Sequence, residues 1–351
     1  MEWIPDYGVF LLKSVTVLVA LIVFVGFVAS LSQRQKGDQR EGRVKIQSLN
    51  DDHEDNLDDF LASVLDPEDY KRHKKDEKKT KKALAKASKK AGKKADAEEA
   101  GRPRVFIMDF DGDIKASAVE GLRKEISTLV ANKAEGDTVI LRLESPGGMV
   151  HSYGLAASQL DRIKNAGIKL VVSVDAVAAS GGYMMACVAD EIAAAPFSVI
   201  GSIGVVAQVP NVHRLLKKND VDVEILTAGK YKRTLTVLGE NTEEGRQKFI
   251  EDLESTHDLF KAFVQEHRPN LDIEAVATGE IWYGKEAVNN GLVDRIATSD
   301  DLILEALQTS QVFRVSYEQK RTLAERLGFA AEQGVIKAFE QLWAQQSKRW
   351  F

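Results

Sequence analysis

An alternation of strand-like and helix-like segments in the middle of the chain predicts an α/β fold built on a parallel sheet. Residues 105–108, 138–143 and 170–174 are short apolar runs, which are typical of buried strands. Residues 119–131 and 150–163 lie between them, and their apolar side chains recur at helical spacing. A strand, a crossover helix and the next strand form a βαβ unit, and such units are right-handed in parallel sheets. The chain has 351 residues and is 44% hydrophobic, so it can fill a core of this kind.

Later segments are expected to continue this architecture. Residues 223–226 resemble another short strand, and residues 242–266 predict a long helix. Residues 323–343 predict a last helix with one apolar stripe, which favours packing against the domain or a neighbouring subunit over contact with a membrane surface. No repeat of fixed period is visible, which argues against a solenoid.

The N-terminal region predicts a transmembrane anchor. Residues 10–31 carry a single charge, at Lys13. As a helix they would span roughly 33 Å, which is enough to cross a hydrocarbon core of about 30 Å. A cleaved signal peptide is the alternative, but Glu2 and Asp6 stand where such a peptide has basic residues, and no clear cleavage site follows. Basic residues follow the span closely, so the positive-inside rule favours a cytoplasmic main domain.

Charge is strongly segregated beyond the anchor, although the net charge of the whole chain is only −5. Residues 51–69 contain nine acidic side chains and no Lys or Arg, whereas residues 71–94 have a net charge of +11. We interpret the basic tract as a solvated, partly helical linker. The alternative is contact with anionic lipid headgroups. Nucleic acid is not an expected partner, because the tract has no aromatic side chains and no recognised nucleic-acid fold accompanies it.

The composition also argues against two classes of protein. The single cysteine, Cys187, excludes an intramolecular disulfide framework and a cysteine-rich metal site. No His, Asp and Glu cluster has convincing ligand spacing, so no metal or other cofactor is expected.

A serine in a glycine-rich run is the first candidate for catalysis. Ser180 follows the strand at 170–174 and a run of small residues, and it precedes an expected helix at 182–188. The unpaired N–H groups and the dipole of a helix N-terminus stabilise negative charge on an attacking oxygen and on a tetrahedral intermediate. The N–H groups of Gly181 and Gly147 are expected to form the oxyanion hole, since Gly147 lies in the turn where another strand ends.

A serine needs a base to become a nucleophile at neutral pH. His151 and His213 remain open as partners, but neither lies in a motif that fixes a Ser–His pair. A lysine can act instead if burial lowers its pKa, because only the neutral amine accepts a proton. Lys230 and Lys232 are both candidates, and their spacing from Ser180 does not choose between them. Ser202, in another glycine-flanked turn, is suited to orient such an amine.

Together these motifs resemble those of the S49 serine peptidases, in the signal-peptide-peptidase-A branch. The resemblance extends over the anchor, the charged connector and a core at about 104–297. It implies that Ser180 is the nucleophile, that Lys232 after Tyr231 is the general base, that Ser202 steadies the lysine, and that Gly147 is the oxyanion glycine. It also implies a ClpP/crotonase-like α/β spiral and assembly into rings or domes in which neighbouring subunits help build the active sites. Family members commonly act outside the cytoplasm, so the side of the membrane stays open.

The expected organisation is an N-terminal tail (1–9), a transmembrane anchor (10–31), a charged linker (32–101), a peptidase domain (102–310), and a C-terminal strand with an amphipathic helix (311–351). The expected function is a homo-oligomeric serine endopeptidase of the inner membrane that cleaves peptides, signal-peptide remnants or unfolded segments. Membrane lipid is an expected partner through the anchor and the Lys-rich linker. A non-proteolytic membrane scaffold on the same fold is the alternative. Acyl-CoA chemistry, which related folds support, is disfavoured by the Ser–Lys pair.

Overall fold

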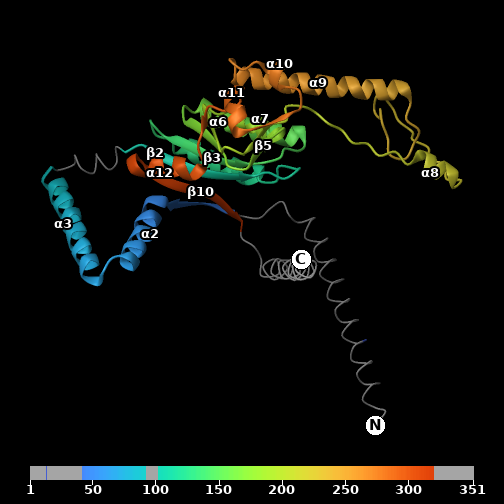
Figure 1. Ribbon diagram of the computed structural model, residues 1–351. Coiled ribbons are helices and arrows are strands. Elements are labelled where there is room, and N and C mark those ends of the chain that lie inside the picture. The colour runs from blue at the N-terminus through green and yellow to red at the C-terminus, as the bar shows by residue number, and fades with distance from the viewer. Residues whose placement is uncertain (1–12, 14–41, 92–101, 320–351) are drawn as a thin grey trace, which may run out of the picture. The chain divides into compact units, whose positions relative to one another are not determined.

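The computed structural model describes Lys13 and residues 42–91 and 102–319 (Figure 1). A sheet of seven strands has the order β1-β10-β2-β3-β4-β6-β9, and the neighbours from β10 to β9 are parallel. In that order the strands are Gly42–Ser48, Gln311–Gln319, Arg104–Asp111, Thr138–Glu144, Lys169–Val174, Glu191–Ala194 and Arg295–Ile296. The α/β class with a mostly parallel sheet, predicted from the sequence, is confirmed.

Helices connect these strands. They are α2 (Leu49–Val64), α3 (Pro67–Ala91), α5 (Val119–Ala131), α6 (Val150–Asn165), α7 (Gly181–Ala186), α8 (His213–Lys218), α9 (Glu243–His267), α10 (Ile273–Val276), α11 (Gly284–Asn289) and α12 (Ser299–Thr309).

The alternation of side chains along the strands builds a core on each face of the large sheet. Phe106, Met108 and Phe110 of β2 pack with residues of α5, α6 and α7. Val105 and Ile107 point to the other face, where they pack with residues of α12. Because both faces are covered, the strands are apolar nearly throughout, as expected for a parallel sheet.

A second, smaller sheet positions the residues discussed below. It has the order β5-β7-β8, with strands Val177–Ala179, Val199–Gly201 and Ile281–Tyr283. β5 and β7 are parallel, with Ala179 opposite Gly201. Ser180 and Ser202 therefore follow directly after two paired positions.

Several predicted elements are found within one or two residues of their expected bounds, including α5, α6, α9, β3 and β4. The strand expected at residues 223–226 is wrong, because these residues form no regular element. They lie in a segment, residues 205–242, whose described hydrogen bonds are to residues of the same segment or of the first two turns of α9. Without a neighbouring strand edge, an apolar run has no ladder to join.

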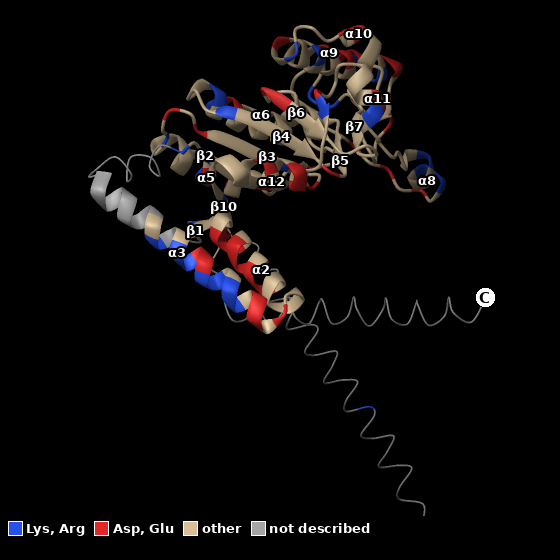
Figure 2. Ribbon diagram, turned by 60° about the vertical axis from the view of Figure 1, so that its left-hand side comes forward, with Lys and Arg blue, Asp and Glu red and all other residues tan. Residues whose placement is uncertain are grey.

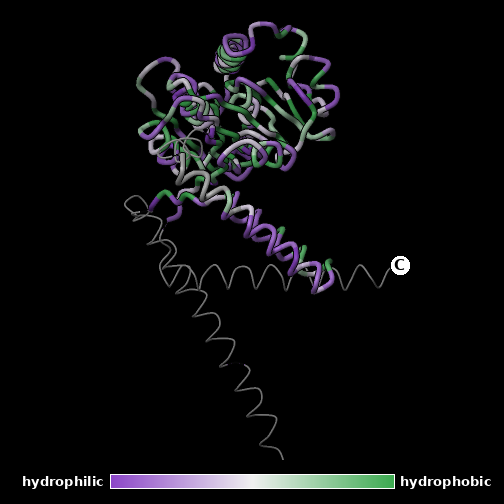
Figure 3. The backbone as a smooth tube through the Cα atoms, turned by 90° about the vertical axis from the view of Figure 1, so that its left-hand side faces the viewer, coloured by the Kyte–Doolittle hydropathy of each residue, from purple (hydrophilic) through white to green (hydrophobic). Residues whose placement is uncertain are grey.

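The region expected to be a charged linker contains regular structure in its described part. β1 joins the large sheet, and α2 and α3 follow it. The acidic α2 and the basic α3 lie side by side (Figure 2). They are joined at Asp58, which pairs with Lys74 at 2.7 Å and accepts a hydrogen bond from Tyr70. Most of α3 is hydrophilic (Figure 3).

The expected anchor at residues 10–31 lies outside the described residues, apart from Lys13, and so does the expected helix at 323–343. Among the residues that the structure describes, no helix is both long enough and apolar enough to cross a membrane.

Candidate active site

Ser180 lies in a sharp turn between β5 and α7. Its φ of 51° and ψ of −118° are unusual for a residue with a Cβ, and such strain is often found at functional sites. Backbone hydrogen bonds on both sides hold the turn. The Ser180 N–H donates to the carbonyl of Gly201 at 2.8 Å, and the Ser180 carbonyl accepts from Met184 at 2.9 Å.

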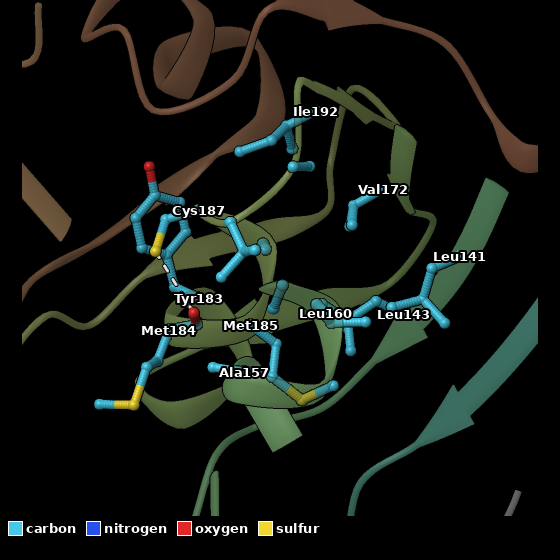
Figure 4. Close-up of a cluster of buried hydrophobic side chains, with 14 of the residues drawn as sticks. Leu141, Leu143, Ala157, Leu160, Val172, Tyr183, Met184, Met185, Cys187 and Ile192 are labelled. Carbon is cyan, nitrogen blue, oxygen red and sulfur yellow. Dashed lines mark hydrogen bonds between the residues drawn. The ribbon is translucent and has the colours of Figure 1, made fainter. Parts of the chain in front are cut away.

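The helix after Ser180 is anchored in the core. All six residues of α7 are buried, and Figure 4 shows Met184 and Met185 among side chains from β3, β4 and α6. Gly181, the first residue of this helix, has an N–H with no partner inside the helix. Burial of α7 therefore fixes a free backbone donor beside the serine.

Gly147 is pressed against this turn. Its φ is +91°, and a Cβ on it would lie 2.8 Å from Ser180 Cβ and 2.8 Å from Gly181 N. Only glycine allows this approach. The Gly147 N–H, which we expected in the oxyanion hole, instead donates to the Ser145 hydroxyl at 3.1 Å. Among the described hydrogen bonds, none engages the N–H of Gly148 or that of Gly181, so both donors are available near Ser180.

A small pocket opens beside Ser180. It is lined mainly by backbone and apolar side chains, from Gly148, Val150, Ser180, Gly181, Met184, Gly204, Val205, Thr256 and Phe260. The lining from α9, Thr256 and Phe260, was not predicted, because nothing in the sequence links this helix to the serine motif. A pocket of this character suits a small apolar side chain.

Ser202 occupies the equivalent place after β7. Its φ is also 51°, and its N–H donates to the carbonyl of Glu280 at 2.6 Å. The pairing of Ala179 with Gly201 brings Ser202 next to the Ser180 turn. The structure thus brings together Ser180, Gly181, Gly147 and Ser202.

The two candidate lysines lie in the segment of residues 205–242, and no lysine lines the pocket beside Ser180. Lys232 is exposed. Lys230 is paired with Glu244 at 2.9 Å and lies over the Tyr231 ring, and its bonds to these two side chains raise the pKa of Lys230. A raised pKa keeps an amine protonated, so Lys230 is poorly suited to act as a base.

The histidines have other partners or none. His257 is 3.2 Å from the carbonyl of Ile203, and His267 is bonded to Asp161 and to the carbonyl of Phe263. Among the described hydrogen bonds, none joins a histidine to Ser180. No group of three or more His, Cys, Asp or Glu in the described part of the chain is arranged to hold a metal ion.

Comparison with known proteins gives consistent matches. The model of peptidase family S49 matches residues 162–313, and that of the family's N-terminal region matches residues 2–160. The chain is 51% identical to "Probable protease SohB" of Haemophilus influenzae, over 98% of both chains. It is 46% identical to the protein of the same name from Buchnera aphidicola subsp. Acyrthosiphon pisum, over 93% of each.

A solved structure of the 1510-N membrane-bound stomatin-specific protease, a lysine-to-alanine mutant in complex with a substrate peptide, is also similar. It is 15% identical, with a TM-score of 0.40, and the match covers 64% of this chain and 96% of that one.

Proposed function

Because the chain belongs to peptidase family S49 and is a serine peptidase, we propose that it hydrolyses peptide bonds with Ser180 as the nucleophile and Lys232 as the general base. The observation that carries this proposal is the strained turn at Ser180, packed against Gly147 at the start of a buried helix. Such a strand-to-helix turn exposes a hydroxyl beside free N–H groups. Ser202, in the paired turn, is proposed to orient the lysine.

The reaction follows from these groups. Neutral Lys232 takes the proton from Ser180 Oγ as this oxygen attacks the scissile carbonyl carbon. The oxygen of the tetrahedral intermediate is held by the N–H of Gly181 and by the turn at Gly147 and Gly148. Collapse breaks the C–N bond, and the leaving amine receives the proton from Lys232. Water then attacks the acyl-serine with the same lysine as base, which releases the acid and restores Ser180.

We propose that a neighbouring copy of the chain supplies Lys232. The segment of residues 205–242, which we call the arm, carries Lys232 and exposes apolar side chains to solvent. Val206 is 85% exposed and Leu226 is 89% exposed. In Figures 1 and 2, α8 of this arm lies apart from the large sheet. Clustered apolar exposure is typical of protein interfaces. A second copy that covers the arm would also desolvate the lysine, which favours the neutral amine.

The proposed substrates are peptides and unfolded segments, including signal-peptide remnants. The pocket beside Ser180 is lined by Val150, Met184, Val205 and Phe260, which suits an apolar residue next to the scissile bond. The pocket is small, so short side chains are favoured.

We propose that residues 10–31 anchor the protein in the inner membrane as a single span, with residues 32–101 as the connector, residues 102–310 as the peptidase domain and residues 311–351 as a packing or oligomerisation segment. Six exposed cations of α3 support a second contact with lipid: Lys71, Arg72, Lys75, Lys78, Lys79 and Lys82. At 100° per residue they lie within about 60° of Lys75 around the helix. This basic face suits an anionic bilayer surface.

Labelling with a fluorophosphonate probe, followed by peptide mapping, tests the nucleophile and the base together. We expect an adduct on Ser180 that is absent from Ser180→Ala. Lys232→Ala should slow labelling and peptide cleavage by about 100-fold or more, because a general base contributes factors of this size.

Lys230→Ala is the matched control, since it removes another exposed lysine two residues away, and it should leave labelling and cleavage within a few-fold of the wild type. Cleavage that persists in Ser180→Ala would rule out the nucleophile. Equal losses in Lys230→Ala and Lys232→Ala would rule out the choice of base.

A further inference from the structure

We propose that Tyr153 is a positioning residue that holds both parts of the oxyanion-binding backbone, through its hydroxyl on one side and its ring on the other. The inference rests on the proposed role of Ser180. Tyr153 lies in the first turn of α6 and is fully buried. The sequence gives no sign of this role, because the groups that Tyr153 contacts come from three other parts of the chain.

The hydroxyl of Tyr153 is part of a chain of hydrogen bonds whose direction is fixed. The Tyr153 hydroxyl is 2.8 Å from the carbonyl of Asp113, which can only accept, so the tyrosine proton is used there. The Ser145 hydroxyl, 2.5 Å from the Tyr153 oxygen, must therefore donate to it. The Ser145 oxygen is then free to accept the N–H of Gly147 at 3.1 Å.

Both hydroxyls of this chain are buried, whereas Asp113 at its end is exposed. Ser145 and Tyr153 have no measurable exposure to solvent, so water cannot replace a lost partner. A buried polar group left without a partner is costly, which makes the whole arrangement resist change. The turn that carries Gly147 and Gly148 is thereby tied to the loop of Asp113.

The ring of Tyr153 supports the backbone at Gly181, which is the second part of the proposed oxyanion-binding backbone. A Cβ on Gly181 would lie 2.4 Å from Tyr153 Cγ, so the backbone that carries the Gly181 N–H rests directly on the ring. Phe110 packs edge-on against the tyrosine ring, with ring centroids 6.4 Å apart. Gly112 leaves room for the hydroxyl end, since a Cβ there would lie 2.5 Å from the Tyr153 oxygen.

The side chain of Tyr153 thus contacts two glycine-containing segments beside Ser180, namely the turn at residues 145–148 and the start of α7. Oxyanion stabilisation depends on donors that are already in place when charge develops, and a shift of about 1 Å can cost about 100-fold in rate. None of the described hydrogen bonds joins Tyr153 to the proposed nucleophile or to the proposed base. Its removal should therefore affect the transition state and leave the binding of the ground-state peptide unchanged.

The test compares Tyr153→Phe with Tyr183→Phe in the full-length chain. Tyr183 is the matched control, because it is also fully buried and its hydroxyl also donates to one backbone carbonyl, that of Leu292 at 3.0 Å. Cleavage of a peptide is measured per active site, titrated to completion with a fluorophosphonate. Binding is measured for a peptide aldehyde, which forms an oxyanion with a serine, and for the corresponding peptide alcohol, which does not.

For Tyr153→Phe we expect kcat to fall about 10- to 100-fold with KM within about threefold of the wild type, since misplaced donors act on the transition state. The aldehyde should bind more weakly by a similar factor, and the alcohol should bind as before. Tyr183→Phe should lower thermal stability and keep kcat within about threefold. Ser145→Ala leaves the Tyr153 ring in place and should reproduce the selective loss of kcat and of aldehyde affinity. The double variant with Tyr153→Phe and Ser145→Ala should have a kcat little lower than that of the worse single variant, because both substitutions break the same chain of hydrogen bonds.

Equal losses of kcat in Tyr153→Phe and Tyr183→Phe would overturn the proposal, and so would equal losses of aldehyde and alcohol affinity. If Tyr153→Phe does not fold, wild-type kcat in Ser145→Ala would overturn it as well. These outcomes differ from failure of the proposed function, which would appear as cleavage by Ser180→Ala.

Discussion

Ser180 and Ser202 share a positive φ, which residues with a Cβ rarely adopt. Each has a φ of 51°, and each follows a strand of the parallel pair β5 and β7. Holding a residue with a Cβ in a sparsely populated backbone region costs about 1–3 kcal/mol, so the surrounding structure must hold both turns in place. The buried helix α7 and the hydrogen bond from Ser202 to Glu280 provide this support. The two strained turns follow paired positions of β5 and β7, so two hydroxyl-bearing residues lie side by side.

Glu125 is a buried carboxyl whose ionisation links the stability of the fold to pH. Burial raises the pKa of this carboxyl to about 7, although the Tyr317 N–H at 2.6 Å favours the charged form. The folded protein therefore holds a proton that the unfolded chain releases above its ordinary pKa of about 4.5. The stability linked to this proton is fully present below about pH 4.5 and is lost as the pH rises to about 7, with a slope of up to about 1.4 kcal/mol per pH unit.

Urea unfolding of wild type and Glu125→Gln between pH 5 and pH 8 measures this effect. Glutamine cannot ionise, so the variant should gain stability relative to the wild type as the pH rises through this range, and the difference should level off above about pH 7. Parallel stability curves for the two proteins would contradict the assignment.

Spacing along the sequence pointed to residues that the structure brings together, but it did not predict how these residues are held. The structure places Ser180, Gly181, Gly147 and Ser202 together, because each follows a strand of adjoining sheets. The bond from Gly147 to Ser145 was not predictable from spacing, since which N–H a turn leaves free depends on its side-chain partners. The position of Tyr153 depends on contacts with residues 28 and 40 positions away.

At the scale of elements, the structure differs most from expectation in the charged region after the expected anchor. A linker was expected there, and the described part contains a strand and two helices. α2 is acidic, α3 is basic, and the Asp58–Lys74 pair joins them. A pair this exposed contributes little stability. Its consequence is geometric, because it turns Lys74 towards α2 while the basic face stays exposed. The runs of charge correctly predicted that most residues of this region are exposed to solvent. The pairing of α2 with α3 was not predicted, because it depends on spatial contacts that composition does not encode.

A prediction follows for the basic face. In full-length protein reconstituted in nanodiscs, hydrogen exchange of α3 should be slower with phosphatidylglycerol present than in pure phosphatidylcholine, because each lysine near an anionic surface gains about 1 kcal/mol. Replacing Lys71, Lys75, Lys78 and Lys82 by Gln should remove the difference, and so should high salt.

The control replaces four exposed lysines that lie elsewhere, namely Lys133, Lys169, Lys218 and Lys285, with the same change in net charge. This variant should keep the lipid-dependent protection. Exchange that is equally fast in both lipids for the unaltered protein would argue against contact of α3 with the bilayer.

The prediction of a strand at residues 223–226 was also wrong because it depended on spatial contacts that the sequence does not show. Its apolar residues are exposed in the arm, and Ile225 and Leu226 are 42% and 89% exposed. An apolar run predicts burial, but it does not say whether the covering surface belongs to the same chain. In the proposed assembly a second copy provides that surface, so the periodicity of a single sequence cannot identify it.

At the scale of the whole molecule, the proposed active site is incomplete in one chain. The proposed oxyanion donors and a pocket lie beside Ser180, whereas Lys232 lies in an arm whose described hydrogen bonds stay within residues 205–248. A closed ring with heterologous contacts would place the same arm against the same neighbouring site at every interface. The account therefore requires that serine and lysine come from different subunits.

Co-assembly of Ser180→Ala chains with Lys232→Ala chains tests this requirement most directly. Each variant alone should be inactive towards a peptide. In assemblies purified through two different tags, random mixing should give about a quarter of the sites an intact pair, so cleavage should return to about a quarter of the wild-type level. Mixed assemblies that stay as inactive as the single variants would show that the serine and lysine do not act across subunits.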